Sequence, residues 1–394
     1  MKLSELNLKN RRALVRVDFN VPLDQNFKVK DDTRIRRAIP TIKYLLDAGA
    51  SVVLMSHLGR PNGPSPEFSL KHVIPCLENL IGSPVKFASD CVGDTALEIT
   101  QPLKTGELVL LENLRFHEEE KAGDEFFAGQ LAENGDVYIN DAFGTAHRAH
   151  ASTAIIARFF HKNKAFGLLL QDEIEALSKV MTEPSRPLLA IIGGAKVSSK
   201  LAILENLVDK VDRLMIGGGM AYTFVLAQGG KVGNSLVEKD MVGRAAAIME
   251  KASARGVEVY LPLDSVCADK FAADANVAVH ATSEIPDDWM GLDIGPASSE
   301  RFAKAVRSSK TILWNGPMGV FEFEAFSNGT FTVAAALKDA TIDGAYTLVG
   351  GGDSVAAINA AGLADDVSYI STGGGAMLEY LEGVELPGII ALTL

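Results

Sequence analysis

The chain has 394 residues, 47% of them hydrophobic and 22% charged, which is long enough for two domains and too apolar for a disordered protein. No apolar run reaches the ~18 residues of a membrane-spanning helix, and residues 1–12 lack the layout of a secretory signal. A net charge of −12 argues against nucleic acid or an anionic membrane as the main partner. Three widely spaced cysteines fit neither a disulfide framework nor a zinc pattern, so we expect buried thiols in a soluble, cytoplasmic protein.

The two parts of the chain differ in composition. Residues 1–170 carry equal numbers of acidic and basic side chains and six of the seven histidines, whereas residues 171–394 carry the whole net charge and 25 of the 36 glycines. Between them an amphipathic helical stretch ends where Pro184 and Pro187 break the pattern. We therefore predict a first domain over 1–170, a linker helix over 171–186 and a second domain over 187–375.

Short apolar runs alternate with helical stretches along both parts. The runs are continuously apolar rather than alternating, which is typical of parallel strands covered on both faces. This rhythm predicts an α/β fold with two doubly wound parallel sheets, whose ligands bind at the carboxyl ends of the strands. The predicted strands are ALVRVDF (13–19), SVVLMSH (51–57), ELVLLEN (107–113), DVYIND (136–141), LLAIIGG (188–194), RLMIGGG (213–219), VEVYLP (257–262), TILWNG (311–316) and YTLVGGG (346–352).

Polar and cationic side chains follow the four strands of the first part. Any one arginine could form a surface ion pair worth only ~0–1 kcal/mol. Gathered at one edge of a sheet, however, these cations would repel one another unless an anion were bound, and arginine matches phosphate and carboxylate well. No His-x-x-His or HExxH spacing indicates a metal here. We predict a small, multiply anionic, hydroxylated substrate, contacted by Asp18, Asn20, Arg34, His57, Arg60, Arg115, His147 and Arg148.

Glycine clusters follow the strands of the second part, but none is a GxGxxG or a GxxxxGK[ST] loop. Lys196 and Lys200 are four residues apart in a stretch that we expect to begin a helix, where like charges and the helix dipole both disfavour them. A bound polyphosphate would reverse both penalties. In GGGDS (350–354), helix-start amides could bind phosphate and Asp353 could hold Mg²⁺, although a simple helix cap is the alternative.

The order of these motifs resembles the phosphoglycerate kinase family over essentially the whole chain. The matching segments are RVDFNVP (16–22), SHLGRP (56–61), NLRF (113–116), DAFGTAHR (141–148), GGAKV (193–197), WNGPMGVFE (314–322), GGGDS (350–354) and STGGGA (371–376). Ser199 and Ser354 stand where some members of that family have an acidic residue and a threonine. The resemblance implies two Rossmann-like domains joined by a hinge helix, with residues from about 376 to 394 returning to the first domain.

The resemblance also implies roles for individual residues. The substrate contacts would be Asp18, Phe19, Asn20, Arg34, His57, Leu58, Gly59, Arg60, Arg115, His147 and Arg148. The nucleotide contacts would be Lys196, Lys200, Gly218, Gly291, Asn315, Glu322, Gly351, Gly352, Asp353 and Ser354, with Mg²⁺ at Asp353. The residues around the transferred phosphoryl group would be Arg34, Lys196, Gly351 and Gly374.

The activity implied is reversible phosphoryl transfer between 1,3-bisphosphoglycerate and ADP, giving 3-phosphoglycerate and ATP in glycolysis and gluconeogenesis, by a monomeric enzyme. A second reading, a dinucleotide-dependent dehydrogenase, is opposed by the missing GxGxxG. A third, a non-catalytic nucleotide-sensing protein of the same fold, predicts loss of Arg34, Lys196 or Asp353, and all three are present.

Overall fold

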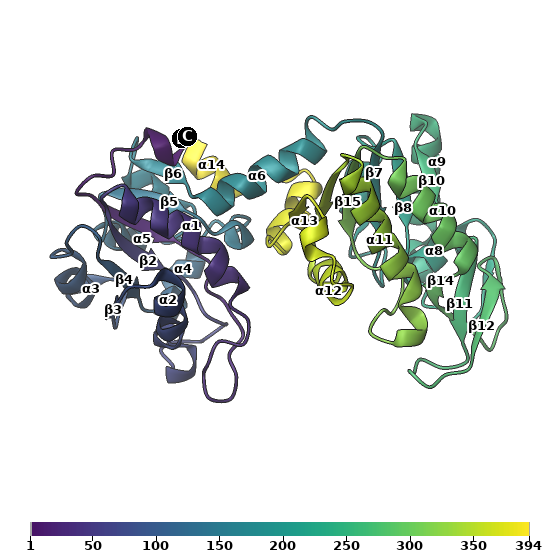
Figure 1. The fold of residues 1–394 in the computed structure, drawn as a ribbon, viewed down its shortest axis with the longest axis horizontal. Coiled ribbons are helices and arrows are strands. Elements are labelled where there is room, and N and C mark those ends of the chain that lie inside the picture. The colour runs from purple at the N-terminus through teal and green to yellow at the C-terminus, as the bar shows by residue number, and fades with distance from the viewer. Residues whose placement is uncertain (1, 394) are drawn as a thin grey trace. The chain divides into compact units, whose positions relative to one another are not determined.

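The computed structural model describes residues 2–393, which form two compact units (Figure 1). The first comprises Met1–Glu175 together with Glu385–Leu394, and the second comprises Ala176–Val384. The last segment therefore belongs to the first unit from Glu385 onwards, later than the position of about 376 expected from the sequence. Helix α6 (Leu168–Met181) contains the boundary between the units.

The first unit is built on a six-stranded sheet with the order β3-β4-β2-β1-β5-β6. Every pair of neighbouring strands is parallel. β2, β4 and β5 are buried along their whole length, as continuously apolar runs predict. The strands are β1 (Arg12–Arg16), β2 (Ser51–Met55), β3 (Val85–Ala88), β4 (Leu108–Leu111), β5 (Val137–Asn140) and β6 (Lys164–Phe166).

The helices of the first unit pack apolar faces onto this sheet. In α1, Ile35, Ile39 and Ile42 recur at helical spacing and join the core, while Asp31 accepts hydrogen bonds from the N–H and hydroxyl of Thr33 at the helix start. The yellow C-terminal helix α14 lies against β6 (Figure 1). The helices are α1 (Thr33–Asp47), α2 (Ile74–Ile81), α3 (Gly93–Thr100), α4 (Glu118–Ala122), α5 (Glu125–Ala132) and α14 (Pro387–Thr393).

The second unit repeats the design with a parallel sheet of order β10-β8-β7-β15-β16-β17. The predicted fold class of two doubly wound parallel sheets is thus confirmed, and so are all nine predicted strands. The strands of this sheet are β7 (Leu188–Ile192), β8 (Arg213–Ile216), β10 (Glu258–Tyr260), β15 (Thr311–Asn315), β16 (Tyr346–Val349) and β17 (Tyr369–Ile370).

Two small sheets of the second unit were not predicted. β11 (Asp264–Ala268) pairs antiparallel with β12 (Val277–Ala281) and β14 (Met290–Ile294), and β9 (Lys231–Val232) pairs with β13 (Glu284–Ile285). β12 is an edge strand that alternates exposed and half-buried residues, so it lacks the continuous apolar run that identified the nine predicted strands.

Seven further helices complete the described part of the second unit. A large core joins the sheet to α10, α11 and α12. None of the helices within residues 2–393 combines the length and the apolar character needed to cross a bilayer. The helices are α7 (Leu201–Leu207), α8 (Met220–Ala227), α9 (Val242–Arg255), α10 (Pro296–Arg307), α11 (Asn328–Ile342), α12 (Gly352–Ala360) and α13 (Gly375–Leu381).

Candidate active site

The topology of the first sheet brings the predicted substrate residues to one edge. β1 is central, and the chain runs from it first to β2 on one side and later to β5 on the other. Ligands bind at such a switch point, beyond the carboxyl ends of the strands. Asp18 and Asn20 follow β1, His57 follows β2, Arg115 follows β4 and His147 follows β5, so four loops deliver polar side chains to the same end of the sheet.

Hydrogen bonds join five of these residues into one network. The Arg34 guanidinium donates to the Asp18 carboxylate at 2.9 Å and to the Asn20 carbonyl at 3.2 Å. The Asn20 amide oxygen accepts from the Gly59 N–H at 2.8 Å, and the Gly59 carbonyl accepts from Arg115 at 2.7 Å. Arg34 and Arg115 are therefore linked through the hydrogen bond between Gly59 and the Asn20 side chain.

His57 lies among cations. His57 is 3% exposed, and its pKa is held well below its usual range by burial and by Arg16, Arg115 and Arg34. Arg16 lies 3.1 Å from His57 Nδ1, and because a guanidinium can only donate, Nδ1 must accept. The ring is therefore neutral and carries its proton on Nε2. Burial, Arg16 and Arg115 likewise lower the pKa of His150 to about 4.

Arg16 and His150 also belong to this cluster but were not predicted from the sequence. Arg16 is 1% exposed at the end of β1, where its Nε donates to Ser152, which in turn donates to Glu120 at 2.6 Å. An arginine inside the apolar run ALVRV was the available signal, since a lone cation in a buried strand needs buried partners.

The other predicted residues divide by exposure. The side chains of Phe19 and Leu58 belong to the hydrophobic core, so these residues can offer a ligand only backbone groups. Arg60 and Arg148 are exposed; Arg60 lowers the pKa of Arg115 and Arg148 lowers that of His150, which places both cations near the cluster. His147 is partly buried beside Arg148.

In the second sheet the switch point lies between β7 and β15, and glycines let the two following loops approach each other. A Cβ atom on Gly193, after β7, would lie 2.1 Å from the Pro317 carbonyl oxygen and 2.5 Å from that of Gly316. Gly218 has φ +67°, and a Cβ atom there would lie 2.6 Å from the Gly194 carbonyl oxygen. Backbone rather than side chains therefore forms this edge.

These loops open onto a cavity of about 670 Å³ within the second unit. Its wall is largely apolar, which suits a planar base, and its glycine backbone suits phosphate. Tyr222, Phe271 and Phe323 were not predicted, because apolar side chains give no motif. The lining includes the predicted residues Gly218, Gly291, Glu322 and Asp353.

Lys200 and Asn315 connect the loops beside this cavity. The Lys200 ammonium donates to the Asn315 side-chain oxygen, and the Asn315 amide donates to the Gly350 carbonyl at 2.8 Å. Burial lowers the pKa of Lys200, and the charge of Asp353 partly offsets this shift. Gly351 has φ +91° and lies so close to Asn315 that a Cβ atom would be 2.7 Å from its amide nitrogen.

The helical argument for the two lysines was wrong. α7 begins only at Leu201, so Lys196 lies in the preceding loop and Lys200 is the cap residue. The loop is held by Ser198, which bonds to Glu238, and by Ser199, whose hydroxyl donates to the Lys196 carbonyl at 2.8 Å. Lys196 is exposed and is not constrained by a helix face.

The helix start predicted in GGGDS (350–354) is confirmed, and a second glycine-rich helix start follows in STGGGA (371–376). α12 begins at Gly352 with exposed Asp353 in its first turn, and α13 begins at Gly375, capped by exposed Gly374. Ser354 is fully buried, and its hydroxyl accepts the N–H of Gly316. This bond ties α12 to the loop after β15, so Ser354 supports the site from behind.

The fit of a magnesium ion depends on Asp353. Mg²⁺ is commonly held by one or two carboxylates together with substrate phosphates and water. Asp353 is exposed at the rim of the cavity, and no ion pair engages it within the described residues. Its carboxylate is thus available, and the donor set fits a hard cation shared with a nucleotide.

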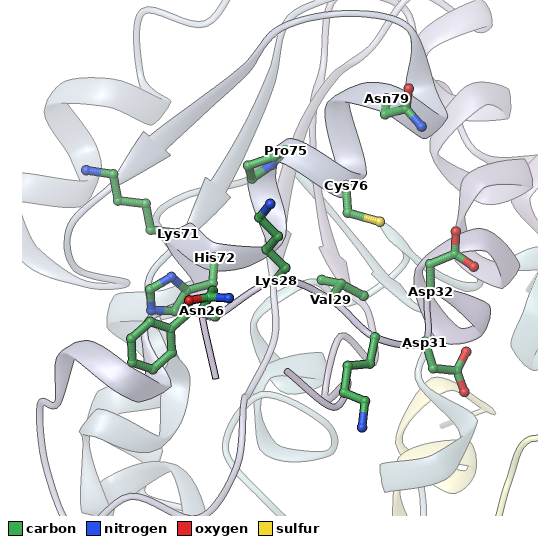
Figure 2. A pocket seen from close by; sticks show the side chains of 12 residues that line it. Asn26, Lys28, Val29, Asp31, Asp32, Lys71, His72, Pro75, Cys76 and Asn79 are labelled. Atoms are coloured by element: carbon green, nitrogen blue, oxygen red, sulfur yellow. The ribbon is translucent and has the colours of Figure 1, made fainter. Parts of the chain in front are cut away.

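A cavity of about 820 Å³ in the first unit contains none of the predicted residues (Figure 2). The Phe27 ring stacks on His72 with centroids 4.6 Å apart. Asp32, in the same lining, pairs with Arg36. Cavity volume alone therefore does not locate the cationic cluster, which is identified by charge and hydrogen bonding.

Comparison with known proteins agrees with this geometry. Residues 3–384 match the family model described as phosphoglycerate kinase. Phosphoglycerate kinases of Moorella thermoacetica and Porphyromonas gingivalis are 54% and 50% identical, covering 100% of this chain and 99% and 100% of their own lengths. A cytosolic phosphoglycerate kinase of Nicotiana tabacum is 53% identical over 99% of this chain and 97% of its own.

Solved structures give the same answer. The phosphoglycerate kinase of Coxiella burnetii matches with a TM-score of 0.93 and 42% identity, and the match covers 100% of this chain and 98% of that chain. That of Pyrococcus horikoshii covers the same shares at a TM-score of 0.83 and 32% identity. Sequence motifs, two parallel sheets and whole-length relatives agree, and the chain belongs to the phosphoglycerate kinase family.

Proposed function

We propose that the protein transfers a phosphoryl group reversibly between 1,3-bisphosphoglycerate and ADP, giving 3-phosphoglycerate and ATP, as a step of glycolysis and gluconeogenesis. The observation that carries this proposal is the cluster of Arg16, Arg34 and Arg115 around the buried His57, whose pKa is lowered by burial and by these arginines. Cations gathered at a buried site call for an anionic ligand. A phosphorylated carboxylic acid supplies charge at both ends.

The chemistry asks little covalent work of the protein. A carboxylate is already a nucleophile, so no general base is needed, and catalysis consists of alignment and charge stabilisation. Arg34 is held by Asp18 and by the Asn20 carbonyl, which fixes its direction before substrate arrives. We assign Arg34, Lys196 and the amides of Gly351 and Gly374 to the transferring phosphoryl group.

The remaining first-unit residues would bind and orient the acid. The neutral His57 presents an Nε2–H donor, while Asp18 and Asn20 can bond to a hydroxyl group. Arg60 and Arg148 would add charge around the non-transferring phosphate, and His147 would add a hydrogen bond. Because Arg34 and Lys196 belong to different units, turnover requires the ligands of both units to meet, and exclusion of water then prevents hydrolysis.

The nucleotide would occupy the cavity of the second unit, where Gly218, Gly291 and Glu322 would contact the adenine base and the ribose. Lys200, Asn315, Gly352 and Ser354 would hold or support the phosphate end. Mg²⁺ at Asp353 would neutralise phosphate charge during transfer. We further propose a cytoplasmic monomer whose partners are these small molecules rather than nucleic acid or membrane.

A coupled assay of ATP formation from 1,3-bisphosphoglycerate and ADP tests the proposal. The alternative, a nucleotide-sensing protein of the same fold, predicts binding of ADP without turnover. Activity that needs both substrates and Mg²⁺ supports the kinase, whereas tight ADP binding with no ATP formed would favour the sensor.

A further inference from the structure

Three potential metal ligands from two segments of the first unit meet outside the site described above. Asp90 and Cys91 lie between β3 and α3, and His117 precedes α4. One ligand atom from each lies within 4.8 Å of the other two, and His117 Nε2 is 2.8 Å from Asp90 Oδ1. The sequence hid this group because 26 positions separate Cys91 from His117, so no short motif spans it.

The spacing suits a tetrahedral ion. Zinc bonds of ~2.0–2.3 Å to nitrogen, oxygen and sulfur place neighbouring ligand atoms roughly 3.5 Å apart. To bind the ion, His117 Nε2 and Asp90 Oδ1 must move slightly apart from 2.8 Å. Ligand atoms separated by up to 4.8 Å must approach each other by about 1 Å. Both carboxylate and imidazole are only partly buried, so small rotations are feasible.

The surroundings fix the ligands and admit solvent. Asn134 donates to the Cys91 carbonyl at 3.2 Å, and the His117 ring packs 5.1 Å from Phe127. Asp90 and His117 line a cavity of about 500 Å³, which provides an entry path and room for a fourth ligand such as water. Cys91 itself is fully buried behind them.

The local charge favours a cation. The carboxylates of Asp90 and Glu119 lie near His117, and those of Asp90 and Glu120 lie near Cys91. Lys71 lines the adjoining cavity, and Arg115 and Lys121 line a second cavity beside His117 together with Glu118 and Glu119.

We propose that Asp90, Cys91 and His117 form a binding site for a thiophilic divalent cation, for which Zn²⁺ is the probe. Imidazole, thiolate and carboxylate together select zinc-like ions over Mg²⁺, which prefers oxygen. Binding converts the Cys91 thiol to a metal thiolate and releases its proton to solvent. Since His117 follows Arg115 by two residues, the ion would also tether the loop that carries a substrate arginine.

The test is Zn²⁺ titration of the metal-free full-length protein against a chromophoric chelator, in the presence of Mg²⁺. Cys91→Ser and His117→Gln should each weaken binding at least ~10-fold, while Cys76→Ser and His72→Gln should not. Co²⁺ should give a sulfur-to-metal charge-transfer band that Cys91→Ser abolishes and Cys76→Ser retains.

Circular dichroism tests whether each variant is folded. If a variant does not fold, Asp90→Asn takes its place, because Asp90 is partly exposed. Proton release measured in weakly buffered solution should reach at least one per Zn²⁺. Equal Zn²⁺ affinity in the wild-type protein and in the Cys91→Ser or Asp90→Asn variants, or a Co²⁺ complex without the thiolate band, would overturn the proposal.

Discussion

The two parallel sheets place their ligand sites at equivalent switch points but build them from different parts of the chain. At the end of β1 the first unit gathers Arg16, Arg34 and Arg115 around a neutral histidine. At the end of β7 the second unit gathers glycines whose backbones come too close for any side chain. One site is therefore specified by side-chain charge and the other by backbone shape, and they should fail differently when mutated.

The largest effect is expected where the second unit supplies a charge. Lys196→Ala should lower kcat by ~10²-fold or more with the fold retained, because it removes one donor to the transferring group. Steady-state kinetics at saturating substrates measures this. Lys239→Ala, an exposed lysine of the same unit, is the control. A near-normal kcat for Lys196→Ala would show that this exposed loop lysine plays no part in transfer.

The first unit should respond to loss of charge through one ligand only. Arg60→Ala and Arg148→Ala should each weaken 3-phosphoglycerate binding by about 10–100-fold, the loss of one charge-assisted hydrogen bond, and leave ATP affinity nearly unchanged. Isothermal titration of each ligand separately measures both. Arg158→Ala, which breaks only an exposed pair with Glu125, should change neither. Matching losses of ATP affinity would contradict the assignment of separate sites.

The second unit should respond to added volume. Gly218→Ala places a methyl group 2.6 Å from the Gly194 carbonyl oxygen beside the cavity, so nucleotide affinity should fall by about 10-fold or more while 3-phosphoglycerate affinity holds. Gly229→Ala is a matched control, because Gly229 also has a positive φ, +85°, with nothing within 4 Å of a Cβ atom. If both variants lose affinity equally, backbone strain rather than site geometry is responsible.

Most strands of both sheets, but not every helix start, could be predicted from the sequence. The nine apolar runs identified nine strands, but β3, β6 and β17 were missed because strands of two to four residues carry too few positions to show a pattern. β10 is equally short, but the apolar run around it extends over residues 257–262. The helix start expected at Lys196 was wrong because Ser198 and Ser199 bond to nearby groups and keep the chain in a turn until Leu201.

Tertiary packing accounts for the rest. α13 was expected to return with the C-terminus, yet Asn206 of α7 donates to the Leu381 carbonyl at 2.6 Å and keeps α13 in the second unit. The apolar residues of the nucleotide cavity were not predicted because Tyr222 and Phe323 look like ordinary core residues in sequence. The charged and glycine motifs were recognisable because these residues gather directly after the predicted strands.

The smallest expected effects concern a feature that the units share. Each buries one aspartate against the first amides of a helix: Asp141 accepts from Leu170 of α6, and Asp293 accepts from Gly329 of α11 at 2.7 Å. Burial raises the pKa of each carboxyl to about 7. The folded protein thus binds these protons more tightly than the unfolded chain, whose aspartates titrate near ~3.9. Their contribution to stability is full below pH ~4 and is lost as the pH rises through about 7.

Asp141→Asn and Asp293→Asn should therefore flatten the loss of stability between pH 4 and 8, because an amide stays neutral throughout. The difference in Tm between each variant and the wild type should rise by on the order of 5 °C from pH 4 to pH 8. Thermal unfolding at constant ionic strength measures it. Asp136→Asn is the control of opposite sign, because the Arg12 hydrogen bonds lower the pKa of Asp136 even though burial opposes them, so its stabilisation is present at neutral pH and lost on acidification. Parallel Tm curves for wild type and both buried-aspartate variants would show that neither carboxyl titrates in this range.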